Sequence, residues 1–220
     1  MSAMVGLTNA LSLRVGNFAD RSDSVKNQWG NSAADEQGYE EARNLTLKVK
    51  ARNPGNAAVF QPLWFYASNN DDQPAATSLA AQRLALDLRS ASAHTLMSVA
   101  YFTDGDGAKA LKLIEEANAL SAARDSDNYL INAGRDHFML GHDQQAIQMI
   151  SQAIDINPSL ADYWCYVAMA YARQGQIEKA RQARDALIKD GLGCKFSDIE
   201  PSKSSAETFK KWHASQVVPA

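Results

Sequence analysis

The feature that most constrains this sequence is a set of small residues that recurs every 34 to 36 positions. The middle copy contains a glycine followed by two alanines, Gly141, Ala146 and Ala153. The same positions recur 34 residues later and 36 residues earlier: Gly175, Ala180 and Leu187, and Gly105, Ala110 and Ala117. Self-similarity at a fixed period of this length is typical of solenoids built from stacked units.

Each unit has the composition of a helical hairpin. The glycine can end a first helix because it enters left-handed conformations at no steric cost. The alanines allow a second helix to approach closely, and Pro158 closes one unit because proline cannot continue a helix. One hairpin cannot bury its apolar face alone, so neighbouring hairpins must stack. The pattern therefore predicts an all-α solenoid.

Composition agrees with this fold class and excludes others. Apolar residues make up 45% of the 220-residue chain, and there are only 12 glycines and 6 prolines, which favours helices over a turn-rich β-sandwich. The net charge of −3 provides no general attraction to nucleic acid or to an anionic membrane. No run of 18 apolar residues occurs, so no segment is expected to span a bilayer.

The repeats divide the chain into segments. The clearest units span 91–126, 127–160 and 161–194, and two degenerate hairpins are expected within 22–90, divided near residue 56. The second helix of the first degenerate hairpin is predicted from Tyr39 to Arg52. Residues 1–21 form an N-terminal segment that the repeat pattern does not assign, and its start lacks the basic residue of a secretory signal. Residues 195–220 are expected to hold a linker and a helix that caps the array.

The last unit carries the most informative motif. It reads Ala161-Asp-Tyr-Trp164, then Val167-Ala168, Tyr171, Gly175, Ala180 and Leu187. This pattern resembles the tetratricopeptide repeat (TPR) family. The resemblance implies a right-handed α-α superhelix of about five hairpins, and a scaffold or adaptor that binds proteins or peptides. The end of the chain also resembles, more loosely, repeat modules of bacterial transcriptional regulators, which implies a partner-sensing role.

In such an array the first helix of each hairpin lines the inner, concave wall. Side chains at helical spacing on these helices are therefore the predicted partner-binding residues. Aromatic residues and arginine are enriched at binding hot spots, and asparagine can bond a peptide backbone. The predicted groove residues are Phe102, Asn128, Ile131, Asn132, Arg135, Phe138, Asp162, Tyr166, Met169 and Arg173. The alternative is that they pack on neighbouring helices or on a chain terminus.

No motif in the sequence predicts catalysis, a cofactor or a metal. Asp104 to Glu115 has part of a calcium-loop pattern, but Lys109 stands where that loop needs glycine. His137 and His142 have a spacing that zinc fingers use, but no cysteine pair precedes them. We therefore expect no enzyme. The alternatives are a self-assembling structural module, including a homodimer, and, ranked lower, a helical enzyme whose site comes from distant residues.

The two cysteines, Cys165 and Cys194, leave the compartment open. Two reduced thiols in a cytoplasmic protein are the first expectation. However, Cys165 falls in the first turn of the last hairpin, and Cys194 falls just after its second helix. Because antiparallel helices bring these ends together, a disulfide is the alternative, and it would indicate a periplasmic or other oxidising location.

Overall fold

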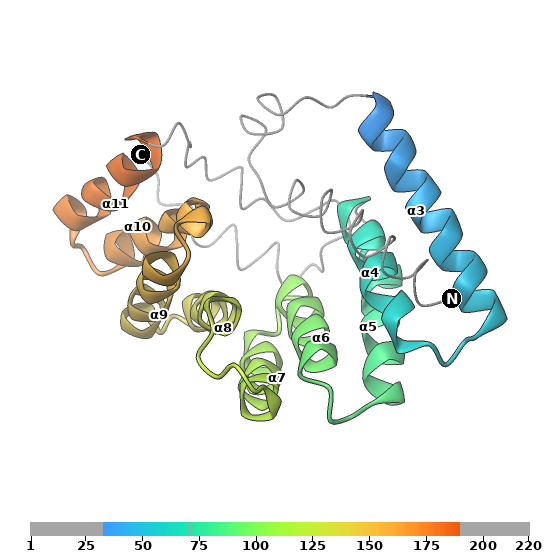
Figure 1. The fold of residues 1–220 in the computed structure, drawn as a ribbon. Helices are drawn as coiled ribbons and strands as arrows, with labels where there is room; N and C mark the ends of the chain where they lie inside the picture. Colours follow the sequence, from blue (N-terminus) through green and yellow to red (C-terminus); the bar gives the residue numbers. More distant parts are fainter. Residues whose placement is uncertain (1–32, 71, 190–220) are drawn as a thin grey trace. The chain divides into compact units, whose positions relative to one another are not determined.

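The computed structural model describes residues 33–70 and 72–189, and the regular elements there are all helices. Figure 1 shows them in order along the chain. The chain divides into two compact units, and the division falls between Leu88 and Arg89. The predicted N-terminal segment 1–21 and the predicted capping helix within 195–220 lie outside the described residues.

The first unit contains one long helix and one hairpin. Its elements are α3 (Ala33–Arg52), the 3-10 turn η1 (Ala57–Val59), α4 (Phe60–Asn69) and α5 (Gln73–Leu86). The sequence predicted a helix from Tyr39 to Arg52, and the structure extends it back to Ala33. Pro62 lies in the first turn of α4, where a missing backbone N–H costs little.

Side-chain caps begin two elements of this unit, the 3-10 turn η1 and helix α5. Asn56 accepts a hydrogen bond from the Ala58 amide at 3.1 Å, and Asp72 accepts one from the Ala75 amide at 3.1 Å. Such caps satisfy amides that have no partner within the helix. Beneath them, Val49 of α3 packs with Val59 and Phe60 in a small buried cluster.

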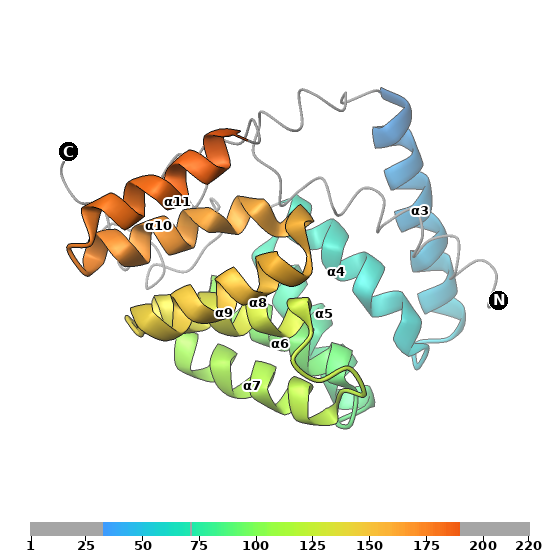
Figure 2. The ribbon, with the colours of Figure 1, turned by 60° about the vertical axis from the view of Figure 1, so that its left-hand side comes forward.

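The second unit contains three helical hairpins. They are α6 (Ala91–Thr103) with α7 (Gly107–Leu120), α8 (Asp127–Met139) with α9 (Asp143–Ile156), and α10 (Trp164–Arg173) with α11 (Ile177–Lys189). A 3-10 segment, η2 (Pro158–Tyr163), leads into α10. Within the unit α7 packs on α8, and α9 packs on α10. Figure 2 shows the two helices of each hairpin lying side by side.

The three hairpins turn in the same way. Gly105, Gly141 and Gly175 all adopt positive φ angles, of 80°, 77° and 72°. The residue after each glycine donates its backbone N–H to a carbonyl five residues earlier, at 2.9 Å: Asp106 to Tyr101, His142 to His137, and Gln176 to Tyr171. This is the Schellman arrangement, which satisfies the last carbonyls of a helix. The predicted helix-ending role of these glycines is confirmed.

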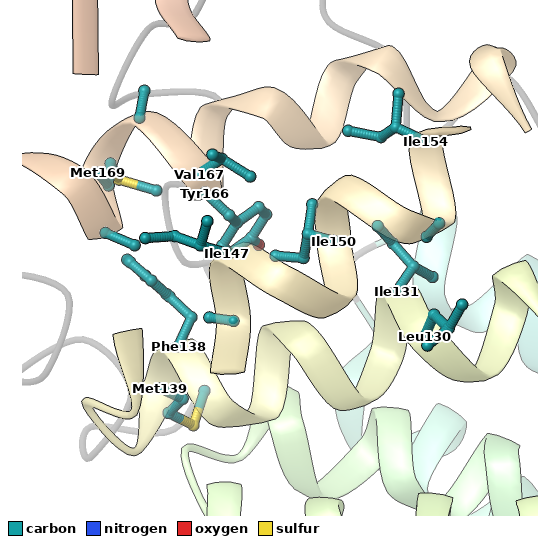
Figure 3. Packing of buried hydrophobic residues seen from close by; sticks show 14 of the residues in the cluster. Leu130, Ile131, Phe138, Met139, Ile147, Ile150, Ile154, Tyr166, Val167 and Met169 are labelled. Atoms are coloured by element: carbon teal, nitrogen blue, oxygen red, sulfur yellow. The ribbon is translucent and has the colours of Figure 1, made fainter. Parts of the chain in front are cut away.

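The main core of the second unit lies where the hairpins stack. Figure 3 labels ten of its residues, among them Phe138, Ile147, Ile150 and Tyr166, which meet between α8, α9 and α10. Alanines such as Ala110, Ala146 and Ala153 are fully buried at the crossings, as their spacing predicted. Of the helices in residues 33–70 and 72–189, none has the length and apolar character needed to cross a bilayer.

Helices α8 and α9 cross closely at Gly134. A Cβ at this position would lie 2.6 Å from Cγ1 of Ile150 and 3.3 Å from the Ile150 backbone nitrogen. These distances are shorter than van der Waals contact, so only glycine permits this approach. The equivalent residues of the neighbouring repeats, Ser98 and Ala168, are also small and buried.

We predict that Gly134→Ala lowers the free energy of unfolding by roughly 1–3 kcal/mol, because α9 must move away and loosen the core around Ile150. Urea unfolding followed by circular dichroism measures this. Gly55→Ala is the control, because a Cβ there would lie no closer than 3.8 Å to any other side chain. Equal losses in the two variants would contradict the argument.

Candidate protein-binding surface

The predicted groove residues lie on successive hairpins of the second unit. Nine of the ten are on the first helices α6, α8 and α10, and Asp162 lies in η2, just before α10. The sequence had placed Asp162 within the helix. The structure begins α10 only at Trp164, because residues 158–163 form a 3-10 segment instead.

Most of the predicted groove residues are buried. The buried ones are Phe102, Ile131, Asn132, Phe138, Tyr166 and Met169. All except Asn132 belong to the main core cluster, so they act as packing between repeats, which was the alternative considered from the sequence. Partner binding by these apolar side chains therefore stays a prediction. The other candidates for contact with a partner are the polar members of the predicted set.

Arg135 of α8 stacks on aromatic rings from the repeats on both sides. Its guanidinium carbon lies 4.2 Å from the ring centroid of Phe102, 5.8 Å from that of Tyr163 and 5.9 Å from that of Tyr166. The two tyrosine rings stack on each other with centroids 6.0 Å apart. A cation over a ring face is attracted by the ring quadrupole, and partial burial strengthens this attraction.

Arg173 of α10 is engaged even more firmly. Its guanidinium lies 3.9 Å from the Phe138 ring centroid and donates to the Phe138 carbonyl oxygen at 2.8 Å. The same group forms an ion pair with Asp143, in the first turn of α9. Only 19% of the Arg173 side chain and 14% of the Asp143 side chain are exposed. Arg173 therefore connects α10 to both helices of the preceding hairpin.

Polar groups near the N-terminal ends of α8 and α10 remain accessible. Asn128 is exposed, and Asp162 and Tyr163 are partly exposed. Asn132 donates from its amide nitrogen to the Asn128 carbonyl oxygen at 2.8 Å. We refer to Asn128, Arg135, Asp162 and Tyr163 together as the α8–α10 rim. Its amide, guanidinium, carboxylate and phenol groups can exchange hydrogen bonds with a peptide backbone and with charged side chains.

Sequence reasoning missed two residues of this surface. Tyr163 lies one position beyond the predicted set, although it follows Tyr129 by the repeat period of 34 and could have been found from that spacing. Asp143, the partner of Arg173, lies on a second helix. The helical stripe on first helices could not have indicated it.

A different surface hollow lies at the turn between α6 and α7. It has a volume of about 490 Å³ and is lined by Tyr101, Leu140 and the turn residues 104–109. Lys109 forms an ion pair with Asp106 at 2.7 Å. The Lys109 ammonium group is therefore paired with one of the carboxylates in the segment that partly resembles a calcium-binding loop. Within residues 33–70 and 72–189, no group of three or more His, Cys, Asp or Glu residues is placed to hold a metal.

Comparison with known proteins agrees with this geometry. Residues 149–182 match the tetratricopeptide repeat family model, a span of one repeat. The crystal structure of MamA aligns with a TM-score of 0.55 at 20% identity, over 74% of this chain and 96% of MamA. The chain contains a tetratricopeptide repeat and has the TPR-type helical repeat fold. The predicted family resemblance and all-α repeat fold are confirmed.

Two further solved structures share the fold of this TPR chain. YrrB, described as a TPR protein with an unusual peptide-binding site, aligns with a TM-score of 0.52 at 15% identity, over 76% of this chain and 88% of YrrB. TTC0263, a thermophilic TPR protein in Thermus thermophilus, aligns with a TM-score of 0.55 at 15% identity, over 82% and 91% of the two chains. No curated protein sequence matches the chain.

Beside the rim, the TPR chain buries a carboxyl group. The Asp136 side chain of α8 is only 1% exposed. Burial raises its pKa from 3.8 to about 8, and the charge of Arg135 and a hydrogen bond with Ser98 oppose this only in part. Asp136 is therefore mostly protonated at neutral pH. Between about pH 4 and pH 8 the folded chain holds a proton that the unfolded chain releases, so stability falls as pH rises.

We predict that Asp136→Asn removes this dependence on pH, because the amide is neutral throughout. At pH 8 the variant should exceed the wild type in unfolding free energy by roughly 5 kcal/mol, with a much smaller difference near pH 4. Urea unfolding at both pH values tests this. Asp155→Asn, at an exposed position of α9, should leave the pH dependence unchanged. An identical pH profile for wild type and Asp136→Asn would show that Asp136 does not carry the effect.

Proposed function

We propose that this chain is a non-enzymatic adaptor that binds a peptide segment of another protein along the α8–α10 rim. The observation that carries the proposal is the stacking of Arg135 between Phe102 of one repeat and Tyr163 and Tyr166 of another. This contact joins three successive first helices into one surface with an arginine at its centre.

The chemistry of the rim supports binding of a peptide. Arginine and tyrosine are the residue types that dominate binding energy at protein interfaces. Stacking on rings restricts the Arg135 side chain before a ligand arrives, which reduces the ordering cost of binding. The exposed amide of Asn128 can bond a peptide backbone, and the guanidinium group can pair with a carboxylate. We therefore expect a segment with at least one acidic side chain or a chain terminus.

The shared fold supports the same class of function. YrrB, which has this fold, is described as having a peptide-binding site. We extend that class of ligand, and not any particular partner, to this chain. The proposal includes the partner-sensing module of a bacterial regulator as one form of the adaptor, and the net charge of −3 favours a protein over a nucleic acid as the partner.

We also propose that the chain works in an oxidising compartment rather than in the cytoplasm. Cys165 is buried in α10 and takes part in a disulfide bond. The other cysteine of the sequence, Cys194, lies outside the described residues. Disulfides persist in the periplasm and outside cells and are rare in a reducing cytosol.

Site-specific photocrosslinking tests the adaptor proposal. We predict that a benzoylphenylalanine residue at Asn128 or Asp162 captures a discrete partner protein in cells of the native host, because both positions belong to the rim. In the control, benzoylphenylalanine replaces Glu178 of α11, whose side chain is 77% exposed.

Partner capture should be several-fold weaker from the Glu178 position. Capture from Glu178 alone would place the binding surface elsewhere. Capture of a second copy of this chain from all three positions would instead support the self-assembling alternative.

Thiol counting tests the compartment. Protein isolated from its native host without reductant and unfolded in guanidinium should show no free thiol, and two after reduction. Reduction should lower the unfolding free energy by about 3 kcal/mol, because the cross-link restricts the unfolded chain. Two thiols before reduction would place the protein in a reducing compartment and leave the adaptor proposal unaffected.

A further inference from the structure

Two histidines meet at the turn between α8 and α9. His137 lies in the last turn of α8 and is partly buried, while His142 immediately precedes α9 and is exposed. Their Nδ1 atoms are 3.2 Å apart, and their ring centroids are 5.4 Å apart with an angle of 48° between the planes. The peptide-binding rim uses neither residue.

The backbone of the turn holds this pair in place. Gly141 lies between them with a φ of 77°, and the His142 amide donates to the His137 carbonyl at 2.9 Å. The same turn brings Tyr101 next to Asp106, and Tyr171 next to Gln176, in the neighbouring hairpins. The fold therefore brings these two positions together in all three hairpins of the second unit, and of these only the middle hairpin has histidine at both.

His142 also departs from what its position in the helix favours. In the preceding hairpin the equivalent residue, Asp106, caps α7 by accepting from the Lys109 amide at 3.1 Å. His142 makes no such cap to α9, and its ring lies against His137 instead. A missing side-chain cap costs a helix about 1 kcal/mol. A local departure of this kind is most often found where a residue serves a function.

The separation of the two nitrogens suits a shared metal ion. Imidazole nitrogens bind Zn²⁺ at about 2.0–2.1 Å, so two of them on one ion lie about 2.9 Å apart at a right angle and about 3.4 Å apart at a tetrahedral angle. The observed 3.2 Å falls between these values. We propose that His137 and His142 chelate one late first-row divalent cation, of which Cu²⁺, Ni²⁺ and Zn²⁺ are the ions that prefer imidazole.

The surroundings leave the histidine pair accessible to a metal ion. The exposed ring of His142 leaves the ion open to water. Asp143, the next residue, is paired with Arg173, so among the described residues two ligands are available here, and water or a group of a bound partner completes the coordination.

Titration of the untagged full chain with Cu²⁺ tests the proposal, with electron paramagnetic resonance as the readout. One Cu²⁺ should bind with micromolar or tighter affinity, and pulsed spectra should show two imidazole ligands. His142→Asp and His137→Tyr, which copy Asp106 and Tyr101 of the sister turn, should each weaken binding roughly tenfold or more and leave one imidazole. Both variants should fold, and the aspartate should restore the cap of α9.

Gln152→Ala, at an exposed position further along α9, is the matched control and should bind Cu²⁺ as the wild type does. Three results would overturn the proposal: unchanged affinity in both histidine variants, binding only at millimolar Cu²⁺, or a single imidazole in the wild-type spectrum. Each would leave the 3.2 Å contact as a hydrogen bond between the two rings. A melting curve for every variant separates loss of the site from loss of the fold.

Discussion

The left-handed glycine turn is the constraint on which the second unit depends. At Gly105, Gly141 and Gly175 the backbone reverses through positive φ angles and closes the same hydrogen bond. This fixes the angle at which the second helix leaves the first, and so decides which side chains meet. The close contact of Gly134 with Ile150 is the consequence in the middle hairpin. Without the turn, small residues at the crossing would not meet, and the core would lose its packing.

Stacking of the hairpins then determines which side chains of the first helices stay accessible to a partner. The same faces that would line a groove also have to pack against the next repeat, and most of their apolar side chains are buried. The two arginines take part in this packing through the rings of Phe102 and Phe138. The binding that we propose therefore uses the α8–α10 rim, where polar side chains stay accessible above the packed rings.

The repeat spacing predicted the hairpins well because both helix ends are encoded locally. Serine at Ser90 and Ser126 begins α6 and α8 by capping, and glycine ends them. Other features were harder to predict. The start of α3 was placed too late, and Asp162 lies in a 3-10 segment rather than in α10. Helical periodicity assigns side chains to a face of a helix, but it contains no information about how near the next helix comes. Buried and exposed residues on the same face therefore cannot be distinguished from the sequence pattern.

The sequence by itself determined the hairpin unit, its period, its glycine turns and its small-residue crossings, because each of these depends on backbone preferences within a few residues. The tertiary structure decided the rest. It placed Arg135 over three rings, Arg173 against Asp143 and His137 against His142, and it buried the carboxyl of Asp136. These arrangements depend on distances between side chains that are five to more than thirty residues apart, and such distances exist only once the helices have packed.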